Sequence, residues 1–366
     1  MGAKVLFKES SGIHLMMAIV IIMIVLTQFY WVFPQGNTVF SQIASLLHFL
    51  CVETFLVLSG FTIGRTLLAD SENNEFSYLW ILQFLKNSFR QLVPFYFFAL
   101  LLNYLLTYVN GFPIEYSWKY LFFVQNLHSP IAAFFPESWI ITIVVFSSLF
   151  FSCLLYCYYR IFKKNRINSL LVISILLIFI SLIFKVYYYF STHNNSINEW
   201  DSALKSVVIY RLDSVFIGVF FYWLQYKVHS FWHKLKSVFF ILGLLGILFI
   251  SFGLGYFRIL IDTYPLFWNV FYLPFVSLSI ACILPFFSEF QIENAFFKSV
   301  ASISSLFYPV YLLHFSVVLQ TMSNFYPIGT LSTFGILIFL FLYIFIIFFL
   351  SFILSLALKK IYFLTN

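Results

Sequence analysis

Four ionisable residues lie inside long apolar stretches of this sequence: Glu53, Arg211, Asp213 and His314. An ionisable group in such a stretch is costly unless it has a partner, so each one is a candidate functional residue. A histidine can take the proton of a hydroxyl group, a carboxylate can orient that histidine, and an arginine can stabilise developing negative charge or bind a phosphate. The set therefore suits a reaction in which a hydroxyl group becomes the attacking group.

A purely structural interpretation of the same residues stays open. Arg211 and Glu53 can pair only to neutralise a buried charge, and a lone histidine in an apolar helix often serves packing. Arg211 and Asp213 are two residues apart, so on one helix they do not face each other. Each of them then needs a different partner.

The composition excludes a water-soluble globular fold. Of the 366 residues, 62% are hydrophobic and only 9% are charged, and the mean hydropathy is +0.97. In soluble domains about a quarter of the residues are charged. The net charge is +7, but the basic residues flank apolar segments and form no single patch, which argues against a nucleic-acid partner. His229 and His233 are four residues apart without a third ligand nearby, so no metal is predicted. The chain is therefore expected to be a membrane protein.

Apolar runs of roughly 20 residues predict about ten membrane-spanning helices. The expected spans are 13–33, 42–69, 84–110, 136–160, 168–191, 205–225, 235–256, 266–288, 300–323 and 331–358. Most of the 20 Lys and Arg residues lie on the termini and the even-numbered loops, which predicts that both termini are cytoplasmic. The expected fold class is all-α, a polytopic integral membrane protein with residues 1–366 in one membrane-embedded domain.

This orientation gives each polar residue a depth. Gln28, His48, His314 and the pair Arg211 and Asp213 fall in the outer half of the bilayer. Lys185 is also expected there, whereas Glu53 lies nearer the middle. Gly60 and Gly64 are four apart in the second span, a spacing that allows close packing of helix backbones. The sequence therefore predicts a buried polar site in the outer half of a helical bundle.

Four segments, taken in order, carry a family resemblance. They read VETFLVLSGFTIG (52–64), KNSFRQLVPFY (86–96), RLDSVFIG (211–218) and SISSLFYPVYLLHF (302–315). Together they resemble the acyltransferase 3 family, membrane proteins that move acyl groups, commonly acetyl, onto sugars and other acceptors. The resemblance spans most of the chain.

The chain also departs from the family pattern. The first span of the family usually carries an arginine and, about three turns later, a catalytic histidine. Here Gln28 is at the late position, and counting back the same distance reaches Met17. The fourth span, beginning at Trp139, resembles a tryptophan-containing family segment, but Val144 and Val145 replace its frequent glutamate pair.

The resemblance implies a membrane O-acyltransferase that moves an acyl group from acyl-CoA, acetyl-CoA in the first instance, to a hydroxyl of a cell-surface glycan or lipid-linked sugar. His314 is then the candidate base, with Asp213 or Glu53 orienting it and Arg211 stabilising charge. The remaining site predictions are Gln28, His48 and Trp139 for substrate, and Arg65, Lys86 and Arg90 for the CoA phosphates.

Two other functions stay open. One is a transporter or flippase of glycan intermediates that uses the same scaffold without chemistry. The other is a catalytically inactive member of the fold that binds a polysaccharide-synthesis partner. The expected location is the cytoplasmic membrane of a bacterium.

Overall fold

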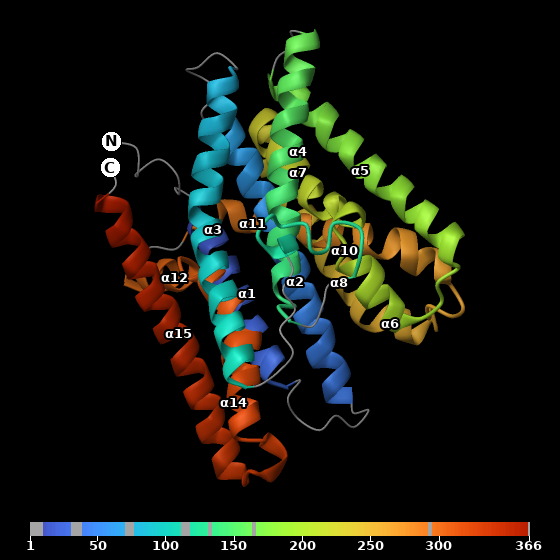
Figure 1. Ribbon diagram of the computed structural model, residues 1–366. Coiled ribbons are helices and arrows are strands. Elements are labelled where there is room, and N and C mark those ends of the chain that lie inside the picture. Colours follow the sequence, from blue (N-terminus) through green and yellow to red (C-terminus); the bar gives the residue numbers. More distant parts are fainter. Residues whose placement is uncertain are drawn as a thin grey trace.

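The computed structural model describes residues 10–30, 39–69, 77–110, 118–130, 134–162, 166–291 and 295–364, and within these ranges it is helical, without a β-strand (Figure 1). The longer helices are α1 (Ser11–Tyr30), α2 (Val39–Ala69), α3 (Tyr78–Val109), α4 (Ser138–Phe162), α5 (Arg166–Thr192), α7 (Leu212–Lys227), α8 (His229–Leu248), α10 (Tyr272–Ala281), α12 (Ala295–Ser304) and α15 (Thr333–Leu364). The shorter ones are η1 (Trp118–Tyr120), α6 (Ile197–Glu199), η2 (Trp200–Lys205), η3 (Val208–Tyr210), η4 (Phe249–Gly253), α9 (Leu254–Tyr256), η5 (Phe267–Phe271), α11 (Leu284–Glu289), α13 (Phe307–Leu313), η6 (His314–Leu319), α14 (Gln320–Phe325) and η7 (Ile328–Thr330). The all-α expectation is confirmed.

Eight helical segments of the described chain are long and apolar enough to cross a membrane, and a ninth if one bent pair is a single span. That pair is Phe296–Ser304 with Phe307–Thr330, bent by 49°. The remaining expected span, 205–225, corresponds largely to α7, which has 16 residues and is therefore about 24 Å long, short of a hydrocarbon core of about 30 Å. The count of ten and the side on which the termini lie stay predictions.

The spanning segments divide into central and peripheral ones. In the segments Ile43–Leu68 and Phe267–Glu289, 67% of the most apolar window is buried, whereas in Thr333–Leu358 the value is 22%. In Figure 1, α15 and α5 lie at opposite edges of the bundle, with α1, α2 and α4 between them. Apolar side chains on the peripheral helices face outward because lipid is their solvent.

Two glycines bring the backbones of α2 and α7 together at the centre. A Cβ atom added at Gly60 would lie 1.8 Å from the carbonyl oxygen of Val215, and one added at Gly218 would lie 2.1 Å from that of Val57. No side chain fits at these distances. The close packing predicted for Gly60 is confirmed, and it brings the polar residues of the two helices within reach of one another.

Hydrogen bonds tie the helices together at each end of the bundle. At one end, called here the Ser10 end, Ser10 Oγ donates to the Phe287 carbonyl (3.3 Å) and Trp232 Nε1 donates to Ser288 Oγ (3.0 Å). At the opposite end, called here the Asn126 end, the Val208 amide donates to the Asn126 carbonyl (3.0 Å). By the loop-charge rule, the Ser10 end is the one expected to face the cytoplasm.

Candidate functional site

Two ion pairs lie in the interior of the bundle, and all four side chains are completely buried. Arg211 Nη2 pairs with Glu53 Oε1, which joins the start of α7 to α2. Lys185 Nζ lies 2.5 Å from Asp213 Oδ2, which joins α5 to α7. Arg211 and Asp213 therefore take different partners, as their spacing predicted, and the hypothesised pair of Arg211 with Glu53 is present.

Serine hydroxyls extend both ion pairs. Ser277 Oγ of α10 lies 3.2 Å from Glu53 Oε2 and 2.8 Å from Ser214 Oγ, and Ser214 Oγ lies 3.4 Å from Glu53 Oε2. Each hydroxyl has one proton to donate within this triangle. Ser181 Oγ lies 3.4 Å from Asp213 Oδ1. The network thus connects α2, α5, α7 and α10, and both oxygens of each carboxylate have a donor.

Arg211 keeps part of its donor capacity. Its Nε and Nη1 atoms are buried and have no hydrogen-bond partner in the part of the chain that the structure describes. Buried N–H groups are nearly always paired, so unpaired ones call for an explanation such as a water molecule or a ligand. A guanidinium with free N–H groups can bind an oxyanion there.

His314 is the first residue of η6 and is 2% exposed. Its Nδ1 atom lies 2.6 Å from the carbonyl oxygen of Tyr311. Because a carbonyl only accepts hydrogen bonds, Nδ1 carries the proton in this contact and Nε2 of the neutral ring keeps its lone pair. The backbone of Tyr311 therefore orients His314, and this corrects the expectation that Asp213 or Glu53 does so, since both carboxylates are paired with basic residues.

Polar residues of α1 and α2 gather near His314. Thr27 Oγ1 lies 3.2 Å from His48 Nδ1, which joins α1 to α2, and α1 also packs against η6, the segment that begins at His314. Gln28 is buried beside Thr27 on α1. The packed elements α1, α2 and η6 thus carry the polar residues Thr27, His48 and His314, here called the polar cluster, and the common depth of Gln28, His48 and His314 stays a prediction.

The sequence analysis missed Glu137, which precedes α4 and is 5% exposed. Its Oε1 atom accepts a 2.5 Å hydrogen bond from the backbone amide of Ser316, and its backbone carbonyl accepts one of 3.2 Å from the Tyr311 hydroxyl. One signal could have identified it, because Glu137 is an acidic residue inside the expected span 136–160. Trp139, predicted to bind substrate, is partly buried against the main core, and its carbonyl accepts from Asn126 Nδ2 (3.4 Å).

Of the three basic residues predicted to bind CoA, only Arg65 lines one of the two cavities described here. Arg65 lines a polar cavity of about 470 Å³ at the Ser10 end, and Lys86 and Arg90 line neither this cavity nor the second one described below. Lys86 is exposed. The assignment of Arg65, Lys86 and Arg90 to the CoA phosphates stays a prediction, with Arg65 the one of the three that lines a described cavity. The other residues of the Arg65 cavity are Ser10, Ile13, Phe61, Tyr222, Gln225, Tyr226, His229 and Ser288.

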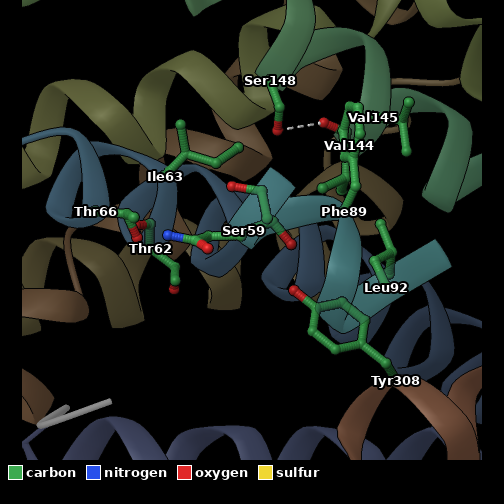
Figure 2. Close-up of a pocket in the computed structure, with 12 residues that line it drawn as sticks. Ser59, Thr62, Ile63, Thr66, Phe89, Leu92, Val144, Val145, Ser148 and Tyr308 are labelled. Carbon is green, nitrogen blue, oxygen red and sulfur yellow. Dashed lines mark hydrogen bonds between the residues drawn. The ribbon is translucent and has the colours of Figure 1, made fainter. Parts of the chain in front are cut away.

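A second cavity, of about 60 Å³, lies among α2, α3, α4 and α13. Figure 2 shows Ser59 of α2 and Tyr308 of α13 with their hydroxyl groups directed into it. Val144 and Val145 form its α4 wall, at the positions where the sequence has valines in place of a glutamate pair. The cavity is consequently lined by hydroxyl groups, an asparagine and apolar side chains, and by no charged residue.

The comparisons with known proteins agree with this architecture. The family model of the acyltransferase 3 family, described as an acyltransferase domain, matches residues 10–359. The chain belongs to the acyltransferase 3 family. No curated protein and no solved structure matches the chain. The resemblance predicted from the four sequence segments is confirmed, and membership implies acyltransferase activity in general and an integral membrane location.

Proposed function

We propose that this acyltransferase 3 family member transfers an acyl group, acetyl in the first instance, from acyl-CoA to a hydroxyl of a cell-surface glycan or lipid-linked sugar. The observation that carries the proposal is the state of His314. With Nδ1–H bound to the Tyr311 carbonyl, Nε2 is left as a base within a buried polar cluster.

The reaction needs one proton transfer and one exchange of bonds. Nε2 of His314 takes the proton of the acceptor hydroxyl as its oxygen attacks the thioester carbonyl. The carbon–sulfur bond then breaks, the sulfur receives the proton, and an ester and a free thiol leave. Gln28 cannot take this proton, since an amide is no base, and it is left with a role in binding the acceptor.

The cavities support entry of the donor from the Ser10 end. Arg65 with Gln225, His229 and Ser288 provides donors that suit phosphate groups. Tyr308 of the second cavity precedes His314 by six residues on one bent helix, a rise of about 9 Å. An uncharged cavity of about 60 Å³ at that point suits the small acyl group of the donor, because burial there of a charged group would be costly.

The buried ion pairs supply the electrostatic part of the proposal. Arg211 is paired with Glu53, and its Nε and Nη1 atoms have no partner among the described residues, so their N–H groups suit an oxyanion that develops during acyl transfer. Asp213 is neutralised by Lys185, so its role is to hold α7 against α5. His48 beside His314 suits contact with the acceptor.

The experiment compares the O-acyl groups of surface glycans by mass spectrometry in bacterial cells with and without the gene. We expect loss of one acyl modification at an unchanged amount of glycan. An unchanged acyl pattern with a reduced amount of surface glycan would replace the proposal with a transporter or flippase. A purified protein in detergent, given radiolabelled acyl-CoA and extracted lipid-linked sugar, provides the direct assay of transfer.

A further inference from the structure

The helix that carries His314 changes its hydrogen-bonding pattern at that residue. The His314 amide donates to the Val310 carbonyl, four residues back, whereas the Gln320 amide donates to the Phe315 carbonyl, five residues back. Between these two bonds, the five amides of residues 315–319 face only the four carbonyls of residues 311–314. At least one amide in the helix must therefore find an acceptor elsewhere. A π turn of this kind often marks a functional position.

Glu137 provides that acceptor. Its Oε1 atom accepts the 2.5 Å hydrogen bond from the Ser316 amide, two residues after His314. Its backbone carbonyl accepts the 3.2 Å hydrogen bond from the hydroxyl of Tyr311, three residues before His314. Glu137 therefore holds the helix on both sides of the histidine. We call Glu137, Tyr311 and Ser316 the Glu137 clasp.

The clasp also reaches the imidazole ring. The carbonyl of Tyr311 accepts the Nδ1–H of His314, so the position of Tyr311 determines the direction of the ring. If the Ser316 amide lost its acceptor, the helix would regain a paired amide by shifting its register, and the ring would turn with it. Displacement of a catalytic group by about 1 Å can cost about 100-fold in rate.

We propose that Glu137 is a positioning residue that fixes the π turn and thereby directs Nε2 of His314 into the polar cluster. The inference rests on the proposed function for its catalytic consequence, whereas the structural consequence stands by itself. Glu137 touches no reacting atom in this proposal. Its Oε1 atom acts through the Ser316 amide, whereas Oε2 is buried without a hydrogen-bond partner among the described residues. A neutral oxygen is sufficient to accept the Ser316 N–H.

The test uses Glu137→Leu and Glu137→Gln in the full-length protein in detergent. The glutamine amide oxygen can accept the Ser316 N–H, whereas leucine cannot. We expect Glu137→Leu to lower kcat about 100-fold with an unchanged KM for acyl-CoA, and Glu137→Gln to keep most of the wild-type kcat. Glu199→Leu, a change at an exposed glutamate, is the matched control and should leave kcat unchanged.

Hydrogen–deuterium exchange of peptides covering α13 and η6 gives a readout that does not depend on activity. We expect faster exchange in Glu137→Leu and wild-type exchange in Glu137→Gln. A wild-type kcat and wild-type exchange in Glu137→Leu would overturn the proposal. So would an inactive Glu137→Gln with wild-type exchange, since the carboxylate would then act in the chemistry itself. A wild-type protein without transferase activity would refute the proposed function, and the exchange result would still decide whether the clasp exists.

Discussion

Arg211 and Glu53 form an ion pair in which both side chains are completely buried, and the pair connects the start of α7 to the middle of α2. Burying such a pair carries a large desolvation cost. Removing one partner leaves the other charge buried without compensation, which strongly destabilises the fold. Close contact between the two helix backbones at Gly60 and Gly218 brings the partners together. The stability of the bundle and the electrostatics of the site therefore depend on the same helix contact.

We predict that Glu53→Leu strongly destabilises the protein, by about 3–5 kcal/mol, because it leaves the Arg211 charge buried without a partner. The double variant Glu53→Leu with Arg211→Met should recover much of this loss. Thermal unfolding in detergent, followed by tryptophan fluorescence, measures both. Asp201→Asn, which breaks the solvent-exposed pair with Lys205, should unfold near the wild-type temperature. Equal unfolding temperatures for the single and the double variant would contradict the prediction.

A second prediction concerns the contact between α2 and α7. Gly60→Ala should lower stability by about 1–3 kcal/mol, since the new Cβ would overlap the Val215 carbonyl and force the helices apart. Gly255→Ala is the matched control, because no atom lies within 4 Å of a Cβ added there. The same unfolding assay applies. If both alanines proved equally harmless, the helices would not be packed as closely as described.

Several features of this site follow from the sequence because they depend on local spacing. Arg211 and Asp213 are two residues apart, so on one helix they point in different directions and need different partners. In the structure these partners are Glu53 for Arg211 and Lys185 for Asp213. Alternation of spans predicts one depth for Gln28 and His314, and both side chains are buried in the bundle. The close approach at Gly60 follows from the small-residue spacing.

Other features depend on tertiary contacts that spacing does not contain. The partner of His314 is a backbone carbonyl, and any residue type supplies one, so the pattern of side chains gives no indication of it. Glu137 can accept the Ser316 amide because the helix that contains Ser316 changes there from α to π hydrogen bonding. The spacing of apolar residues in the sequence does not predict that change. That Arg65 lines a cavity while Lys86 is exposed depends on which face of each helix is turned toward its neighbours.

A third prediction distinguishes Arg65 from Lys86 by their effect on acyl-CoA binding. Arg65→Gln should raise the KM for acyl-CoA about tenfold with little change in kcat, as expected for loss of one charge-assisted hydrogen bond of roughly 1.5 kcal/mol. Lys86→Gln should leave both constants unchanged, because the exposed Lys86 lines neither cavity. Initial rates at varied acyl-CoA concentration provide the measurement. A larger KM effect at Lys86 than at Arg65 would place donor binding outside the Arg65 cavity.

The last prediction isolates the base from the orientation of its ring. Asparagine at position 314 can donate its amide N–H to the Tyr311 carbonyl, in place of Nδ1–H, but it has no second nitrogen that can accept a proton. His314→Asn should therefore fold like the wild-type protein and lose acyl transfer by about 10²–10⁴-fold, the usual contribution of a general base. His314→Ala should lose transfer as well and also unfold at a lower temperature, since the Tyr311 carbonyl then loses its buried donor.

The comparison of His314→Asn with wild type has a definite meaning only if both proteins bind acyl-CoA equally well, so binding is measured for each by calorimetry. With equal binding and equal unfolding temperature, a large drop in kcat can come only from the missing Nε2 lone pair. Unimpaired transfer by His314→Asn would instead assign the base to another residue of the cluster. His48 is then the residue to test, because it is an imidazole that contacts Thr27 of α1, the helix that also packs against η6.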